Sequence, residues 1–494
     1  MAGVAEWVCC PGELNKTLLT ALARSPELHR WQLQDERSAA FFALGRMQAT
    51  ARPVAVVAGS GSSATALMPA LVEAYYERRS LIIITVDTEK PSAGAYGRIE
   101  QESLFGFYAP TVELHLPCRV ADLPDIAALC GEGVPVHIRL LCGEGVRCEG
   151  SLARVDDPPP PAAFRGSLAP LSQMLRFHAH EGLVLLLGAL DPDEQEPALW
   201  LARTLRVPVV ADATSGLREK LAPFLLHGAD ELLREHRPSY VLRLGGVPSC
   251  RFWRALEDMP DTEVYSITRT GFSGLRRAST VMEGEMEQIM KALGDVPHVG
   301  DTMGLLAHAR RFAGRTEERL LSYPESAPAL VRAFSQHASL AEVVFLGSPS
   351  AMRLWNRYAQ LQVPTLYTRS VSQAGGADGA LAAFLGNAVD APHACALIGD
   401  IALLRDLPAL QLLEQLPPGK RVIAILNNEG AGLSATKEMD DELRRLIVQP
   451  PAFSARELAR LCHADFYTIR TEADLEVLES LEDNATVILD IQPE

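Results

Sequence analysis

The stretch Gly399-Asp400-IALLRDLPALQLLEQLPPGKRVIAIL-Asn427-Asn428-Glu429-Gly430 contains polar residues at the ends of two apolar runs. The first run, ACALI, precedes Gly399-Asp400, and the second, VIAIL, ends at the asparagine pair. An amphipathic segment and a Pro-Pro-Gly turn lie between them, so the pattern predicts a strand, a crossover helix and a parallel strand. Ligands bind beyond the carboxyl ends of such strands, where both polar groups are expected.

These polar residues suit a hard divalent cation. Mg2+ prefers oxygen ligands in near-octahedral geometry, usually a carboxylate or two together with phosphate oxygens. Asp400, an asparagine and a main-chain carbonyl of the turn EGAG offer such ligands. Backbone N–H groups at the start of the helix after Asp400 could receive phosphate. The alternative is a simple helix cap and an asparagine turn, which are common roles of these residues.

Composition limits the class of protein. A chain of 494 residues predicts two to four domains. The net charge of -16 argues against non-specific nucleic-acid binding. Apolar runs such as LVLLLGAL are far shorter than the roughly 20 residues of a membrane-spanning helix, and the start MAGVAEWVCCPGE does not resemble a signal peptide. The nine cysteines contain no CxxC pair, so we expect a cytoplasmic protein without a disulfide framework or zinc site.

Strand and helix patterns alternate along the whole chain. The segment VAVVAGSGSS precedes a helical pattern and then LIIITVD, which predicts a right-handed βαβ unit. Four prolines in VDDPPPP, residues 155–161, interrupt the pattern, and a second break lies around 295–328. We therefore predict three α/β domains, each with a mostly parallel sheet flanked by helices. Their predicted bounds are 1–155, 162–295 and 325–494.

The spacing within the opening stretch is more specific than its composition. Gly-Asp, 26 intervening residues and Asn-Asn resemble the thiamine-diphosphate signature. By this resemblance Asp400, Asn428 and the carbonyl of Gly430 hold Mg2+, which holds the cofactor's diphosphate. This cofactor also requires a glutamate at its aminopyrimidine ring in a poorly hydrated site. Glu36 is the candidate because it opens the apolar helix ERSAAFFALG, although the helix dipole alone favours an acid there.

A wider resemblance spans nearly the whole chain. The blocks CPG, DERSAAFFALG, RPVAVVAGSGSSATALMPALVEA, VPVVADATSGLR and YVLRLGG occur in the order typical of the MenD family. That family decarboxylates 2-oxoglutarate on thiamine diphosphate and adds the four-carbon unit to isochorismate, a transferase reaction that forms a carbon–carbon bond. The resemblance implies a pyrimidine-binding domain, a cofactor-free middle domain and a diphosphate-binding domain. The implied cofactor-binding residues are Pro11, Gly12, Gly347, Ser348, Gly399, Asp400, Ile401, Asn428, Gly430 and Leu433.

The same resemblance implies an assembly of subunits. In a homodimer or a dimer of dimers, the active site would lie between two chains. Glu36 of one chain would face the diphosphate-binding domain of its partner.

The departures from the family pattern fall where substrate carboxylates are expected. The arginine after Pro11-Gly12 is replaced by Leu14, and another falls on Ser372. The bulky residue that bends the cofactor falls on Ala377. Because arginine binds a carboxylate through a fixed two-pronged fork, these losses alter the substrate end. The residues predicted to meet substrate are Asn15, Lys16, Gln101 and Arg353, and the bases that could compensate are Arg98, Arg276 and Arg277.

Two hypotheses follow from these departures. The first is an active decarboxylase and carboligase that acts on 2-oxoglutarate or a related 2-oxoacid with an acceptor. The second is a homologue that has lost the reaction and acts as a cofactor-binding or regulatory protein. Retention of both Glu36 and the Gly-Asp…Asn-Asn pair favours the first.

Two further patterns indicate other ligands. Residues 59–64 match the GxGxxG/A dinucleotide fingerprint between a strand and a helix, but Asp87, the nearest acid, lies farther along than a ribose-binding acid should. His178 and His180 could bind a metal, but they lack a third ligand. Neither pattern matches its class as well as the Gly-Asp…Asn-Asn spacing matches thiamine diphosphate.

Overall fold

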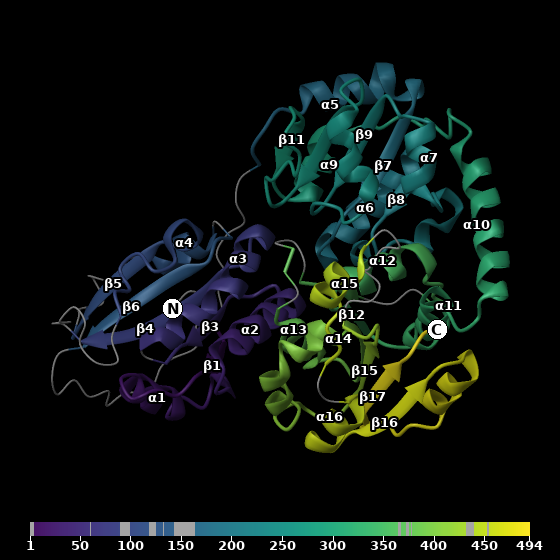
Figure 1. The fold of residues 1–494 in the computed structure, drawn as a ribbon. Helices are drawn as coiled ribbons and strands as arrows, with labels where there is room; N and C mark the ends of the chain where they lie inside the picture. The colour runs from purple at the N-terminus through teal and green to yellow at the C-terminus, as the bar shows by residue number, and fades with distance from the viewer. Residues whose placement is uncertain are drawn as a thin grey trace. The chain divides into compact units, whose positions relative to one another are not determined.

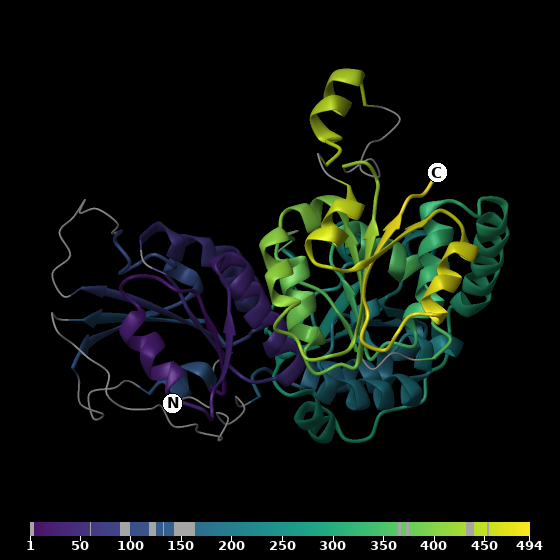
Figure 2. The same ribbon diagram turned by 90° about the horizontal axis from the view of Figure 1, so that it is seen from below.

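The computed structural model contains three parallel sheets (Figures 1 and 2). It describes residues 4–59, 61–88, 99–117, 125–131, 133–142, 164–363, 367–371, 375–376, 378–430, 439–451 and 454–494. The chain forms two compact units, and each is described by itself. Unit 1 comprises Met1–Pro161, Val371–Ala391 and Ile401–Pro418, and unit 2 comprises Ala162–Ser370, Pro392–Asp400 and Gly419–Glu494.

Unit 1 is built on a six-stranded parallel sheet with the order β2-β1-β3-β4-β6-β5. Its strands are β1 (Glu6–Cys9), β2 (His29–Gln32), β3 (Val54–Val57), β4 (Leu81–Thr88), β5 (Thr111–Leu116) and β6 (Val136–Cys142). Its α-helices are α1 (Lys16–Ala23), α2 (Glu36–Thr50), α3 (Met68–Glu77), α4 (Ile126–Gly131) and α13 (Ala380–Ala388), and the 3-10 segments are η1 (Gly61–Leu67), η2 (Gly106–Tyr108) and η9 (Leu407–Leu412).

Helix α2 is buried around its circumference because it packs on β3 and on α13. Two glycines allow the close approach of the helices. A Cβ on Gly45 would lie 2.2 Å from the carbonyl oxygen of Ala383, and one on Gly386 would lie 2.3 Å from that of Phe42. Both obstacles are backbone atoms, which cannot move aside as a flexible side chain does.

The variant G45A is therefore expected to lower the free energy of unfolding by about 2 kcal/mol, because overpacking typically costs 1–3 kcal/mol. Gly314 is the matched control, because it lies in α10 (Leu305–Ser322) and a Cβ there would meet nothing within 4 Å. G314A should leave stability unchanged or raise it by up to about 1 kcal/mol through helix propensity. Chemical denaturation of both variants checks this, and equal effects would contradict the packing account.

Unit 2 contains two sheets, the first of which is five-stranded with the order β11-β10-β9-β7-β8. Its strands are β7 (Leu183–Leu187), β8 (Val209–Ala211), β9 (Tyr240–Leu244), β10 (Glu263–Thr268) and β11 (Thr280–Glu283). The associated helices are α5 (Ala169–Gln173), α6 (Pro192–Leu205), α7 (Ala229–Glu235), α8 (Arg251–Ala255), α9 (Met286–Leu293) and α10, and the shorter helical turns are η4 (Met174–His178), η5 (Ala179–Glu181), η6 (Ala213–Ser215), η7 (Glu219–Phe224) and η8 (Leu256–Asp258).

Alternate residues of β7 pack on opposite faces of this sheet, as the period of a strand requires. Leu183, Leu185 and Leu187 share a core with α6 and α9. Val184 and Leu186 share another with α7, α8 and the start of α10. The continuous apolar run LVLLL is thus explained by burial on both sides, which is typical of parallel sheets.

The second sheet of unit 2 has six strands with the order β13-β12-β14-β15-β17-β16. Its strands are β12 (Val343–Leu346), β13 (Tyr367–Arg369), β14 (His393–Gly399), β15 (Lys420–Leu426), β16 (Asp465–Ile469) and β17 (Thr486–Ile491). Its helices are α11 (Ala327–Ala338), α12 (Pro349–Tyr358), α15 (Asp441–Ile447), α16 (Ala455–Leu461) and the 3-10 segment η11 (Glu472–Glu479). Helix α14 (Asp400–Leu404) begins where β14 ends. Helix α15, labelled in Figure 1, has no buried residue.

A buried polar network joins the first sheet of unit 2 to helix α12. Asp212 accepts from the Ser249 N–H at 2.6 Å and from Asn356 Nδ2 at 3.1 Å. Asn356 Oδ1 in turn accepts from the Ala213 N–H at 2.6 Å. Burial raises the pKa of Asp212 to about 6. The middle segment of the chain therefore braces the helix that follows β12.

The predicted α/β architecture with three mostly parallel sheets is confirmed. The three predicted domain boundaries stay a prediction, and the expected linker at 155–161 lies outside the described residues. The described part of the chain contains no helix with the length and apolar character needed to cross a membrane.

Candidate active site

Glu36 is the first residue of α2 and lies at the carboxyl end of the unit 1 sheet. Asp35 caps the helix by accepting from the Ser38 N–H at 2.8 Å. Glu36 Oε1 accepts from the Gly59 N–H at 3.2 Å, just beyond the end of β3. A Cβ on Gly59 would lie 2.7 Å from this carboxylate oxygen, so glycine leaves room for the acid. The helix cap and the acid are thus separate residues.

Asn15 braces the loop beside this glutamate. Its Nδ2 donates to Cys10 O at 2.8 Å and to Ala58 O at 2.7 Å, while its Oδ1 accepts from the Gly12 N–H at 2.9 Å. The side chain is 2% exposed, so its amide is committed to the protein. This shapes the Pro11-Gly12 turn, and contact of Asn15 with substrate stays a prediction. We call Gly12, Asn15, Glu36 and Gly59 the Glu36 cluster.

A buried acid that the sequence did not single out anchors the same helix. Asp406 accepts from Ser38 Oγ at 2.7 Å and from the Ala382 N–H at 2.7 Å. It therefore ties the first turn of α2 to the start of α13 within unit 1. Burial raises the pKa of Asp406 to about 6. Its only signal in the sequence is an acid inside the apolar segment ALLRDLPAL.

The raised pKa of Asp406, about 6 against an ordinary 3.8, predicts a pH dependence of stability. The folded state binds this proton more tightly, so its stabilising contribution is complete below about pH 4 and is lost as the pH rises through 6. D406N can still accept from the Ala382 N–H and donate to Ser38, and it should lack this dependence. The difference between wild type and D406N should change by about 2 to 3 kcal/mol between pH 4 and 7. Urea unfolding of both at each pH measures it, and parallel curves would contradict the assignment.

Two predicted substrate residues of unit 1 lie in contrasting environments. Gln101 is 3% exposed, and its buried Oε1 has no hydrogen-bond partner within the described residues. A buried carbonyl without a donor costs free energy, so this oxygen is suited to a bound molecule. Lys16 opens α1 and is exposed. Arg98 lies outside the described residues.

In unit 2, β14 and β15 are neighbours in register, and Gly399 pairs with Leu426. Asp400 and Asn427-Asn428 therefore follow adjacent parallel strands, as predicted. Asp400 Oδ2 accepts from the Gly430 N–H at 2.7 Å and from the Asn428 N–H at 3.3 Å. The carboxylate is 7% exposed and orders the turn that follows β15.

The turn has a left-handed backbone at Glu429 (φ 56°) and Gly430 (φ 77°). A Cβ on Gly430 would lie 1.9 Å from Gln449 O, so only glycine fits. The Gly430 carbonyl accepts from the Gln449 N–H at 2.9 Å and retains a second lone pair. Asn427 has a structural role: its Nδ2 donates to Asp490 at 2.9 Å, and its Oδ1 accepts from the Glu429 N–H at 3.2 Å.

The start of α12 completes the group in unit 2. Ser348 caps this ten-residue helix by accepting from the Ala351 N–H at 3.1 Å. Gly347 N donates to Leu397 O at 2.9 Å, which joins the end of β12 to β14. A Cβ on Gly399 would lie 3.1 Å from Ser348 Oγ, so glycine keeps this space open. We call Ser348, Gly399, Asp400, Asn428 and Gly430 the Asp400 cluster.

The remaining predicted residues lie apart from these contacts or outside the described residues. Ile401 follows Asp400 in α14 and is partly buried. Arg353 is exposed on α12, with Ser350 Oγ 3.4 Å away. The guanidinium of Arg277 donates to main-chain carbonyls, including Met259 O at 2.9 Å, and the neighbouring Arg276 is exposed. Leu433, Ser372 and Ala377 lie outside the described residues.

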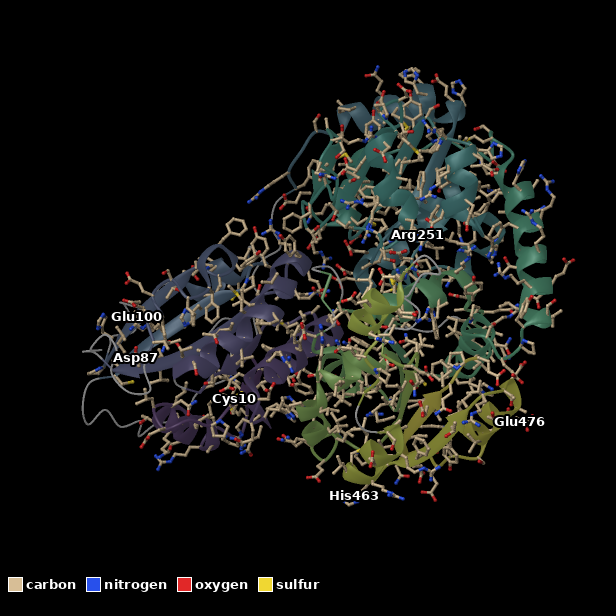
Figure 3. The ribbon with its side chains drawn as sticks, viewed as in Figure 1. Cys10, Asp87, Glu100, Arg251, His463 and Glu476 are labelled. Carbon is tan, nitrogen blue, oxygen red and sulfur yellow. The ribbon has the colours of Figure 1, made fainter. Side chains whose placement is uncertain are left out.

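The alternative ligand patterns gain no support from their surroundings. Asp87, labelled in Figure 3, is 2% exposed and pairs with Arg139 at 2.9 Å, so a ribose would compete with an ion pair. Nδ1 of His178 lies 3.0 Å from Glu181 on an exposed turn. Within the described residues no group of three or more His, Cys, Asp or Glu side chains could hold a metal ion.

The Asp400 cluster nevertheless suits a hard cation that carries a diphosphate. One carboxylate, one carboxamide and one main-chain carbonyl are oxygen ligands, and phosphate oxygens would supply others. The N-terminus of α12 presents backbone N–H groups next to the space kept open by Gly399. In unit 1, the buried Gln101 oxygen, which has no partner among the described residues, could accept a hydrogen bond from a bound molecule.

Comparison with known proteins defines the class. The family model "Thiamine pyrophosphate enzyme, N-terminal TPP binding domain" matches residues 1–105. The chain also resembles the X-ray structure of a putative thiamin diphosphate-dependent enzyme from Mycobacterium smegmatis. The TM-score is 0.69 at 17% identity, over 99% of this chain and 96% of that one, which shows the shared fold. The chain has the fold and the N-terminal domain of a thiamine pyrophosphate enzyme.

Curated relatives define the family within this class. The 2-succinyl-5-enolpyruvyl-6-hydroxy-3-cyclohexene-1-carboxylate synthase of Akkermansia muciniphila is 45% identical over 100% of this chain and 94% of its own length. The protein of that name from Halorhodospira halophila is 30% identical over 92% and 86% of the two chains. The chain belongs to the 2-succinyl-5-enolpyruvyl-6-hydroxy-3-cyclohexene-1-carboxylate synthase family, and the resemblance to MenD is confirmed.

Proposed function

We propose that this chain is a Mg2+-dependent thiamine-diphosphate synthase that decarboxylates 2-oxoglutarate and adds the four-carbon unit to isochorismate. The observation that carries the proposal is the Asp400 cluster at the ends of β14 and β15. The 45% identity to a curated synthase over the whole chain supports the same reaction. That relationship favours an active enzyme, and no comparison favours a lapsed homologue.

Asp400, Asn428 and the Gly430 carbonyl would hold Mg2+. Gly347, Ser348 and Gly399 would receive the diphosphate at the start of α12, with Ile401 and Leu433 at the same end of the cofactor. Bound thiamine diphosphate supplies a nucleophilic carbon that takes up the 2-oxoacid and stabilises the charge left by decarboxylation. Net negative charge elsewhere on the chain does not oppose this, because local dipoles and the metal determine the field at the site.

Glu36 would hold a proton at the aminopyrimidine nitrogen, and Pro11 and Gly12 would line the same end. The Gly59 N–H at 3.2 Å orients one carboxylate oxygen and leaves the other available. The buried Gln101 oxygen would accept a hydrogen bond from the substrate or the cofactor. Lys16 and Arg353 would attract the substrate carboxylates, while Asn15 would keep the Pro11-Gly12 turn in shape.

The proposal includes the organisation of the protein. Residues 1–155 would bind the pyrimidine, 162–295 would form the middle domain and 325–494 would bind the diphosphate. A homodimer or dimer of dimers in the cytoplasm would bring Glu36 of one chain to the Asp400 cluster of its partner.

The test is turnover by the whole protein with thiamine diphosphate and Mg2+. Release of CO2 from 2-oxoglutarate should require both, and consumption of isochorismate should accompany it. Other 2-oxoacids, such as pyruvate and oxaloacetate, test whether the lost arginines altered the donor. Cofactor binding without turnover of any 2-oxoacid would overturn the proposed reaction.

A further inference from the structure

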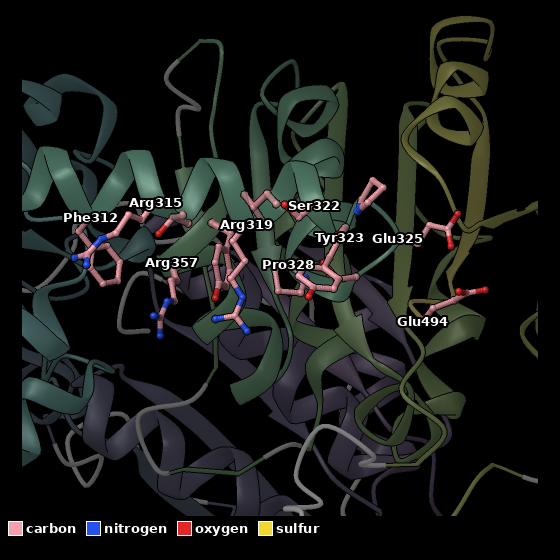
Figure 4. A pocket seen from close by; sticks show the side chains of 14 residues that line it. Phe312, Arg315, Arg319, Ser322, Tyr323, Glu325, Pro328, Arg357 and Glu494 are labelled. Atoms are coloured by element: carbon pink, nitrogen blue, oxygen red, sulfur yellow. The ribbon is translucent and has the colours of Figure 1, made fainter.

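A cavity in unit 2 shares no residue with the Asp400 cluster. It has a volume of about 780 Å3 and lies between α10, the start of α11 and the end of α12 (Figure 4). This volume is in the range of sites for small organic ligands, which is roughly 300–1,000 Å3. Its lining residues are Phe312, Arg315, Thr316, Arg319, Leu320 and Ser322, then Tyr323, Pro324, Glu325, Ser326, Pro328, Arg357, Tyr358 and Glu494.

The charges in this cavity are segregated. Figure 4 shows Arg315, Arg319 and Arg357 toward one end, and Glu325 and Glu494 at the other. The side chains of Tyr323 and Pro328 lie between the two ends. A ligand that fits all three parts would have an anionic group, an apolar body and a donor group at its far end.

The arginines differ in their partners. Arg357 pairs with Glu231 at 2.8 Å, and the nearby Arg332, which does not line the cavity, is bonded to Glu317 and to Gln360. Arg315 and Arg319, by contrast, have no carboxylate partner within the described part of the chain. They stand one turn apart on α10, where two like charges repel each other.

The carbon Cζ of Arg315 lies 5.9 Å from the centre of the Phe312 ring, and that of Arg357 lies 5.7 Å from it. One aromatic ring therefore gathers two guanidinium groups at the same end of the cavity. The whole chain has a net charge of -16, so this positive end opposes the overall charge. A bound oxyanion would relieve the repulsion and accept hydrogen bonds from the guanidinium forks.

We propose that this cavity binds a small organic oxyanion, bearing phosphate or carboxylate, through Arg315 and Arg319, with its apolar body against Tyr323 and Pro328. The site is separate from the proposed cofactor site and does not depend on the proposed reaction.

Isothermal titration of the full chain with phenyl phosphate, and with inorganic phosphate, tests the proposal at low ionic strength. Phenyl phosphate should bind more tightly because only it has an apolar body, and both affinities should fall as salt rises. The variant R315Q/R319Q should weaken binding at least tenfold. R310Q/R311Q is the matched control, because these two exposed arginines lie on the same helix and do not line the cavity.

A repeat of the titration with saturating thiamine diphosphate and Mg2+ tests whether phenyl phosphate binds in the cavity or in the proposed cofactor site. Phenyl phosphate binding should survive their addition, whereas displacement would assign it to the cofactor site and overturn the proposal. If R315Q/R319Q and R310Q/R311Q weakened binding equally, the loss would follow from the lower positive charge of the helix and not from the cavity. That result would also overturn the proposal. If neither probe gave a heat of binding or changed the melting temperature of the wild-type chain, the proposal would likewise be overturned. Circular dichroism of each variant establishes that it is folded.

Discussion

Replacing Glu36 with glutamine is expected to lower 2-oxoglutarate turnover by about 100- to 10,000-fold, the range of contributions from a positioned proton-transfer group. Glutamine has nearly the same shape, and its Oε1 can still accept from the Gly59 N–H that lies 3.2 Å from Glu36. It cannot exchange a proton with the aminopyrimidine ring. The loss should therefore fall on kcat, while Mg2+-dependent cofactor affinity changes only modestly.

The start of helix α2 is held in place by residues other than Glu36, so the substitution tests the chemistry and not the fold. Asp35, not Glu36, caps the helix, and Asp406 anchors its first turn through Ser38. Folding should therefore survive E36Q. Glu27 is an exposed acid of the same unit, and E27Q is the matched control, with wild-type turnover expected. CO2 release and calorimetric titration of thiamine diphosphate are the two measurements. Turnover by E36Q within threefold of E27Q would remove Glu36 from the proposed chemistry.

The pattern around Asp400 could be predicted because it depends on local information. Apolar runs that end in Gly-Asp and Asn-Asn define two buried parallel strands, and adjacent strand ends meet at one edge of a sheet. The need for glycine at position 430 is also local, because its backbone is left-handed, a conformation that other residues rarely adopt. The part of the cluster from Gly399 to Gly430 is therefore encoded within about 30 residues of sequence, as is typical of a βαβ unit, whereas Ser348 comes from an earlier strand end.

The anchor of α2 could not be predicted in this way. Ser38 and Asp406 are separated by 368 residues, and neither has a pattern that indicates the other. Residues 371–391 and 401–418 follow the strands of the third predicted domain, yet their contacts group them with unit 1. Such contacts depend on tertiary packing, which periodicity within one segment does not report.

The asparagine pair provides the second large expected effect, because the structure gives its two members different tasks. N428A should weaken Mg2+-dependent binding of thiamine diphosphate by about 100-fold, since it removes a proposed ligand side chain. Loss of even an outer-shell partner of a metal site typically costs 10- to 100-fold in affinity. The Asn428 backbone N–H, 3.3 Å from Asp400, remains in this variant, so the turn should persist.

N427A is the matched control one residue away. It loses the bond to Asp490 at 2.9 Å and leaves Asp490 with one fewer donor, so its cost should appear as about 1–3 kcal/mol of stability. Its cofactor affinity should stay within a few-fold of wild type. Calorimetric titration with and without Mg2+, together with denaturant unfolding, separates the two outcomes. If N427A lost the cofactor and N428A kept it, the metal would have to be assigned to the first asparagine. If both kept it, Asn428 would not be a ligand of the metal, and the proposed ligand set would be wrong.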